Sequence, residues 1–141
     1  MGRGAGQLVK ALHGVALVAL VLMAARPVYA QEPIAVPSGL AVHWFETLRD
    51  SQGPNGLTLR FRFVAPDLAG PDYDPDLATA DLQALCDGYV LARLPEMGPQ
   101  PAEIVLDLAD REVPFGEPNE DAVQFFEAFS VQHGACVWEF Y

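Results

Sequence analysis

Hydrophobic and polar residues alternate most regularly between Leu57 and Val64. Large apolar side chains occupy every second position of this segment, and Arg60 and Arg62 stand between them. A period of two residues predicts a β-strand with one face buried and the other turned to solvent. A similar pattern covers Leu40–Arg49, and residues 50–56 between the two segments are rich in turn-forming residues. The two segments therefore predict a β-hairpin.

The spacing of the apolar residues becomes helical after Asp74. Asp74 is suited to cap a helix N-terminus, and Pro75 is suited to the first helical position. The predicted helix runs from about Pro75 to Leu94, because Pro95 cannot continue it. Cys86 falls on the apolar side of this helix, which we expect to face a strand.

Further strands are expected toward the C-terminus. Glu103–Leu108 and Ala135–Phe140 both alternate in polarity. Residues 119–131 are compatible with a helix or with a strand, and we favour a strand in their second half. The reason is that His133 and Gly134 have the form of a two-residue hairpin turn leading into the last strand.

Together these elements predict a single domain of the α+β class over residues 31–141. The expected order is β-β-α-β-β-β, with one main helix lying on a small antiparallel sheet. The abundant aromatic residues favour a folded core over disorder.

The first 30 residues have the three parts of an export signal. A positively charged start is followed by an apolar run, Ala11–Ala25, and then by the small residue Ala30. We expect cleavage between Ala30 and Gln31, and therefore a periplasmic or secreted protein. The alternative is an uncleaved membrane anchor. It is disfavoured because the apolar run is shorter than the roughly 20 residues that span a bilayer.

Removal of residues 1–30 would change the charge of the chain. The whole sequence has a formal net charge of −11; without the signal, five arginines face 19 acidic residues, which gives −14, and no lysine remains. Such a charge disfavours nucleic acids and anionic lipids as partners. It could attract cations or a basic partner, such as a protein or a basic ligand in the cell envelope, but many exported proteins are simply acidic, so the partner stays unknown. No stable membrane span is expected after cleavage.

Cys86 and Cys136 are the only cysteines in the sequence. An even number of cysteines in an exported chain favours a disulfide, here between the predicted helix and the last strand. A zinc site made of these cysteines with His43 and His133 is the alternative. It is less favoured because only His133 and Cys136 have the close spacing typical of zinc ligands.

Two other groups of residues could carry chemistry. Asp72, Asp74 and Asp76 alternate as at the start of a calcium loop, but the glycine and glutamate that such a loop needs further on are missing. A divalent-cation site there remains an alternative to helix capping. His43 or His133 with a nearby carboxylate could serve a small hydrolase by acid–base chemistry.

Arg60 and Arg62 lie on the outward face of their strand, where they could bind an anionic ligand or pair with acidic neighbours. The sequence contains no glycine-rich phosphate loop and no nucleophile elbow, so we expect no cofactor and assign no catalytic residue.

Three stretches of the chain carry a resemblance: Gly56–Pro66, Phe125–Glu127 and Gly134–Glu139. They resemble an uncharacterised family of small exported bacterial proteins, a domain of unknown function, over about Val36–Phe140. The resemblance implies no known activity. Some relatives bear the label acetolactate synthase, which we do not carry over, because a thiamine-dependent synthase needs a much longer chain and a cofactor site.

These observations favour an exported protein without catalytic activity, either a binding domain or an accessory domain of the cell envelope. A small periplasmic hydrolase and a divalent-cation binder are the alternatives.

Overall fold

A computed structural model describes residue 2 and residues 29–53 and 56–140 of the chain; the side chains of residues 50–53 are also outside this description. The predicted signal peptide therefore lies almost entirely outside the described residues. Of its residues, only Gly2, Tyr29 and Ala30 are described.

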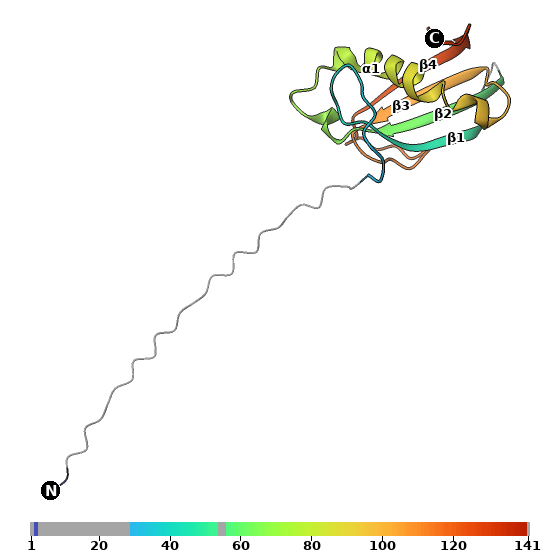
Figure 1. Ribbon diagram of the computed structural model, residues 1–141. Helices are drawn as coiled ribbons and strands as arrows, with labels where there is room; N and C mark the ends of the chain where they lie inside the picture. Colours follow the sequence, from blue (N-terminus) through green and yellow to red (C-terminus); the bar gives the residue numbers. More distant parts are fainter. Residues whose placement is uncertain (1, 3–28, 54–55, 141) are drawn as a thin grey trace.

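In the described part of the chain, one sheet of five strands runs in sequence order (Figure 1). The strands are β1 (His43–Gly53), β2 (Gly56–Val64), β3 (Glu103–Ala109), β4 (Gln124–Gln132) and β5 (Ala135–Glu139). The β2–β3 pair is parallel, and the other three pairs are antiparallel.

The predicted antiparallel sheet was therefore wrong: the sheet is mixed, and the domain is mostly sheet. The physical reason is the long segment between β2 and β3. It crosses over one face of the sheet and returns the chain in its original direction, as a parallel pair requires. Period-two patterns are the same in parallel and antiparallel strands, so the pattern alone did not distinguish the two.

The predicted helix from Pro75 to Leu94 was too long. The α-helix α1 covers only Ala78–Leu85, after a 3₁₀ turn at Pro75–Leu77, and it continues into one π-helical turn at Cys86–Val90. Two further 3₁₀ turns lie at Pro66–Ala69 and Leu94–Met97. The π-helical turn follows α1 directly and contains Gly88, and glycine weakens helices.

The predicted cap at Asp74 is confirmed. Its side chain accepts a hydrogen bond from the Asp76 backbone N–H at 3.0 Å, and Pro75 takes the first helical position.

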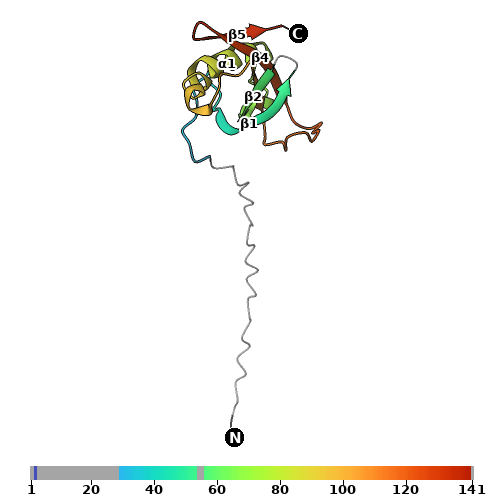
Figure 2. The same cartoon turned by 90° about the vertical axis from the view of Figure 1, so that its right-hand side faces the viewer.

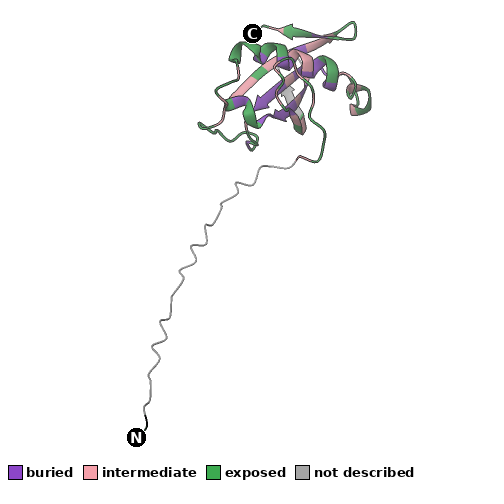
Figure 3. Ribbon diagram, turned by 60° about the vertical axis from the view of Figure 1, so that its left-hand side comes forward, coloured by how far each residue is buried: buried purple, intermediate pink, exposed green. Residues whose placement is uncertain are grey.

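The core lies between α1 and one face of the sheet (Figure 3). Phe61 and Phe63 of β2 and Phe129 of β4 are almost fully buried there, together with Leu82 and Leu85 of the helix. Burial of such large apolar side chains is the main force that holds helix and sheet together.

The predicted disulfide is present between Cys86, at the end of α1, and Cys136 in β5. Two helical side chains add to this link. Gln83 Nε2 donates to the Cys136 carbonyl at 3.0 Å, and Asp87 Oδ1 accepts from the Cys136 N–H at 3.1 Å. The helix thus satisfies backbone groups on β5, an edge strand whose unpaired groups would otherwise be open to other chains. Because the two sulfurs are bonded to each other, they are not thiolates for zinc.

None of the helices in the described residues is long and apolar enough to cross a membrane.

Candidate functional site

The second face of the sheet, which we call the open face, is turned away from α1. The loop between β3 and β4, residues 110–123, lies on this side (Figure 2). Arg62 of β2, Asp107 of β3 and Phe126 of β4 are direct neighbours across the strands. They alternate with the core residues of the same strands, so they share the open face.

Arg62 and Asp107 form a buried ion pair on this face. Only 4% of Arg62 and 2% of Asp107 is exposed. Arg62 Nε donates to Asp107 Oδ2 at 2.8 Å, Nη1 donates to Glu46 Oε1 at 2.5 Å, and Nη2 donates to the Val113 carbonyl at 2.7 Å. One guanidinium therefore links β1, β2 and β3 to the β3–β4 loop. These three hydrogen bonds hold the guanidinium in a fixed position.

Burial raises the pKa of the Asp107 carboxyl, and the hydrogen bond and positive charge of Arg62 oppose this rise. The net pKa lies above the ordinary value for aspartate. The cause is the removal of the carboxylate from water, which disfavours its charged form.

A small cavity of about 140 Å³ lies beside this ion pair, under the β3–β4 loop. We call it the loop pocket. Arg60, Asp107, Gln124, Phe115 and Phe126 contribute to its lining. The Arg60 guanidinium carbon lies 5.4 Å from the centre of the Phe115 ring, within the range of a cation–π contact.

Two polar atoms of the loop pocket residues are buried without a hydrogen-bond partner: Arg60 Nε, a donor, and Asp107 Oδ1, an acceptor. The Gln124 side chain lies beside Asp107 and favours its charged form, while Oδ1 itself has no hydrogen-bond partner. Buried polar groups are nearly always paired with protein, water or a ligand, so this pair of atoms indicates a place for a further molecule.

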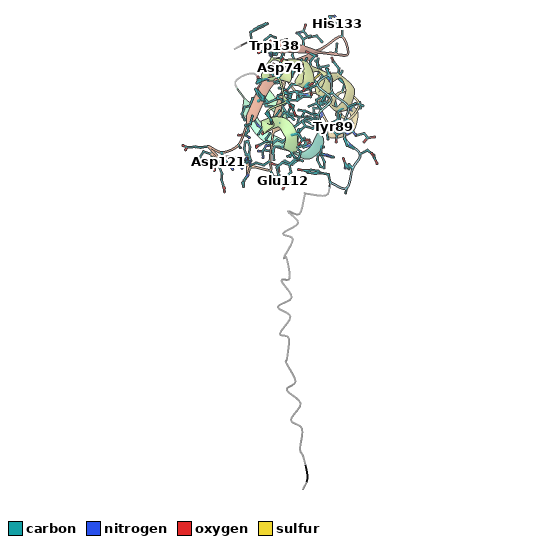
Figure 4. All side chains as sticks on the ribbon, turned by 90° about the vertical axis from the view of Figure 1, so that its left-hand side faces the viewer. Asp74, Tyr89, Glu112, Asp121, His133 and Trp138 are labelled. Atoms are coloured by element: carbon teal, nitrogen blue, oxygen red, sulfur yellow. A yellow bond between two sulfur atoms is a disulfide. The ribbon has the colours of Figure 1, made fainter. Side chains whose placement is uncertain are left out.

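The histidines are not assembled into an acid–base pair with a carboxylate among the described residues. His43 begins β1; its Nδ1 is buried without a hydrogen-bond partner, and its ring stacks on Tyr29 at 4.1 Å between ring centres. His133 is exposed at the tip of the β4–β5 hairpin, at the end of the molecule opposite Glu112 and Asp121 (Figure 4).

The hairpin turn at His133 is the one expected from the sequence. His133 and Gly134 have φ angles of 53° and 77°, which suit the tight turns that join antiparallel strands. Glu139 of β5, the strand that follows this turn, accepts a hydrogen bond from Ser130 Oγ at 2.5 Å.

Asp72, Asp74 and Asp76 are exposed, and Asp74 serves as the cap described above. In the part of the chain that the structure describes, no cluster of three or more histidine, cysteine, aspartate or glutamate side chains is arranged to hold a metal ion.

Sequence reasoning placed Arg60 and Arg62 on the outward face but missed their neighbours Asp107, Glu46 and Phe115. For Asp107 a signal existed, because it is an acidic residue inside the otherwise apolar run Ile104–Leu108. For Phe115 there was none, since only the folding of the β3–β4 loop brings its ring to Arg60.

Comparison with known proteins gives a family but no activity. No curated protein and no solved structure matched the chain. A family model described as a family of unknown function (DUF6497) matches residues 17–141, nearly the whole sequence. This confirms the expected membership of an uncharacterised family: the chain belongs to the family of unknown function DUF6497.

Proposed function

We propose that the protein is an exported binding domain without catalytic activity, and that it holds its partner on the open face of the sheet. The observation that carries the proposal is a group of exposed aromatic rings beside a guanidinium. Phe115 is 54% exposed and Phe126 is 53% exposed, and both line the loop pocket with Arg60.

The aromatic surface extends beyond the loop pocket to the edge strand β5, where Trp138 pairs with Phe129 and so lies on the α1 side of the sheet. Phe126 also lines a second, shallow hollow of about 360 Å³, together with Val105, Trp138 and Phe140. Phe140 is 79% exposed. Contiguous exposed apolar side chains are costly in water and are typical of interaction surfaces.

The arrangement of polar groups favours binding over catalysis. Arg62 and Asp107 are held by fixed partners in the interior. Neither His43 nor His133 makes a hydrogen bond or an ion pair with a described carboxylate, so the hydrolase alternative lacks its assembled acid–base pair.

Export is supported by the pattern of residues 1–30 and by the cysteines. A disulfide persists in an oxidising compartment such as the periplasm or the extracellular space, whereas the cytosol keeps thiols reduced. The bond between Cys86 and Cys136 is therefore compatible with an exported protein.

The test is affinity purification from envelope extracts with a matched pair of variants. Phe126→Ser removes an exposed ring from the open face; Leu77→Ser is the control, since Leu77 is 37% exposed next to α1, away from that face. We expect the wild-type chain and Leu77→Ser to retain the same co-purifying partner and Phe126→Ser to lose it. Equal retention by all three chains would refute the open face as the binding surface.

A further inference from the structure

We propose that the loop pocket binds the carboxyl end of an amino-acid unit: a free α-carboxylate on Arg60, the adjacent N–H on Asp107, and an apolar side chain against Phe115 and Phe126. This inference deepens the proposed function and rests on it. The unit could be a small N-acylated amino acid or the last residue of a peptide, since both present the same chemistry.

The carboxylate is assigned to Arg60. Among the described residues, Arg60 has no ion pair, whereas Arg62 is already held by two carboxylates. Arg60 Nε is buried and has no acceptor. A guanidinium presents a fork of N–H donors that matches a carboxylate, and a buried donor without an acceptor is unfavourable.

The N–H is assigned to Asp107. Its Oδ2 is held by Arg62 at 2.8 Å, while its Oδ1 is buried without a hydrogen-bond partner. Since the Asp107 side chain is 3% exposed and fixed by Arg62, Oδ1 is held in place before any ligand arrives. A ligand that offers both an acceptor and a donor would satisfy both unpaired groups at once.

The size and the rim of the pocket define the rest of the ligand. A volume of about 140 Å³ admits a head group and not a whole peptide. Phe115 and Phe126 are each more than half exposed at its rim, where an apolar side chain would cover them. A doubly charged phosphate fits less well, because Asp107 would repel the second negative charge.

The experiment is isothermal titration of the full chain, with its disulfide intact, with N-acetylphenylalanine and with N-acetylphenylalanine amide. A pentapeptide ending in phenylalanine is titrated as the free acid and as the amide. We expect each acid to bind roughly tenfold or more tightly than its amide, as for other hydrogen bonds to charged groups. If the peptide acid binds more tightly than N-acetylphenylalanine, the ligand is the end of a peptide chain. If the two acids bind equally, the ligand is a free amino-acid unit.

Variants separate Arg60 from general charge effects. Arg60→Gln should lose the preference for the acid, and Arg60→Lys should retain part of it, because lysine keeps the charge without the fork. Arg49→Gln makes the same charge change at an exposed residue of β1 and should bind like the wild type. Thermal unfolding confirms that each variant folds, and Arg60→Lys replaces Arg60→Gln should the latter fail to fold.

The proposal is overturned if no acid binds, if acid and amide bind equally, or if Arg60→Gln binds like the wild type. If the loop pocket holds only water, neither acid binds. The proposed function has its own readout: if Phe126→Ser still loses an envelope partner, only the ligand class is wrong. If neither experiment shows binding, both proposals fall.

Discussion

Arg62 illustrates how a single residue can organise a face of the molecule. Its guanidinium is in the interior, and it contacts Glu46, Asp107 and the backbone of Val113. A charge of this kind is tolerated in a protein interior only when its hydrogen-bonding capacity is met by fixed partners. The β3–β4 loop and the loop pocket therefore depend on this side chain.

Replacement of Arg62 by methionine should be strongly destabilising. The variant leaves the Asp107 carboxylate buried without its cation, which typically costs about 3–5 kcal/mol in the free energy of unfolding. Urea unfolding followed by circular dichroism measures the loss. The double variant Arg62→Met/Asp107→Leu should recover much of it, because it removes both charges. If Arg62→Met lowered the free energy of unfolding by less than about 1 kcal/mol, the account would be contradicted, because an ion pair exposed on the surface contributes about that much.

Tyr73 is a second residue whose environment has a measurable consequence. Its hydroxyl donates to Asp81 Oδ2 at 3.2 Å, and the Ser38 N–H donates to Oδ1 of the same carboxylate at 2.9 Å. Asp81 is fully buried in α1. Burial, together with the Asp81 charge, raises the pKa of Tyr73 from 10.0 to about 12.

The pH dependence follows from the direction of this shift. A phenol whose pKa is higher in the folded state contributes its full stability below pH 10 and loses it as the pH rises toward about 12. We expect the free energy of unfolding to fall across this interval. The free energy of unfolding of Tyr73→Phe should fall less steeply, because this variant has no phenol at position 73 that could ionise. Urea unfolding at either end of the interval measures both slopes, and identical slopes would contradict the assignment.

At the scale of elements, the link between α1 and β5 joins segments that are far apart in the sequence. Cys86 and Cys136 are separated by 50 residues. A cross-link restricts the unfolded chain more strongly as the loop that it closes becomes longer. The disulfide therefore supports the short edge strand β5 together with the hydrogen bonds of Gln83 and Asp87.

Reduction of the disulfide should lower the free energy of unfolding by roughly 4 kcal/mol, on the chain-entropy account of a loop of this length. Urea unfolding with and without reductant measures the change. The variant Cys86→Ala/Cys136→Ala should be as unstable as the reduced wild type and insensitive to reductant. A response of the variant to reductant would show that the effect does not come from this bond.

The elements also show where sequence reasoning succeeded and where it failed. The strand β2 and the cap at Asp74 were predictable, because alternation and capping depend on residues close together in the chain. The solvent exposure expected for one face of β2 was wrong, since Thr58 and Arg62 on that face are buried. The parallel pairing of β2 with β3 was missed, and α1 was expected to be more than twice as long. Strand direction and helix length depend on packing partners that are distant in the sequence.

For the whole molecule, the proposed export has the widest consequences, and processing after Ala30 is its direct test. Mass spectrometry of the protein from its native compartment should give the mass of residues 31–141. Ala30→Gln should block cleavage, because a large polar residue replaces the small one before the cut. Ala35→Gln is the control, since Ala35 is exposed and lies beyond the site. A full-length mass for the wild type would contradict the prediction.

Processing should also uncover His43. The Tyr29 ring stacks on His43 at an interplanar angle of 14°, and cleavage after Ala30 would remove it. We expect a histidine-acylating reagent to modify His43 faster in the processed protein than in the Ala30→Gln precursor. His133 is exposed at its hairpin turn and serves as the internal reference. Equal rates at His43 in the two forms would refute the prediction.

The sequence by itself determined the acidic charge, the outward position of Arg60 and the single possible pairing of two cysteines. These follow from composition and from local periodicity. Only the tertiary structure decided that β2 lies parallel to β3, that Arg62 and Asp107 are buried, and that the β3–β4 loop closes a pocket over them. The reason is that periodicity shows which residues share a face, whereas long-range packing decides which strands become neighbours and what covers that face.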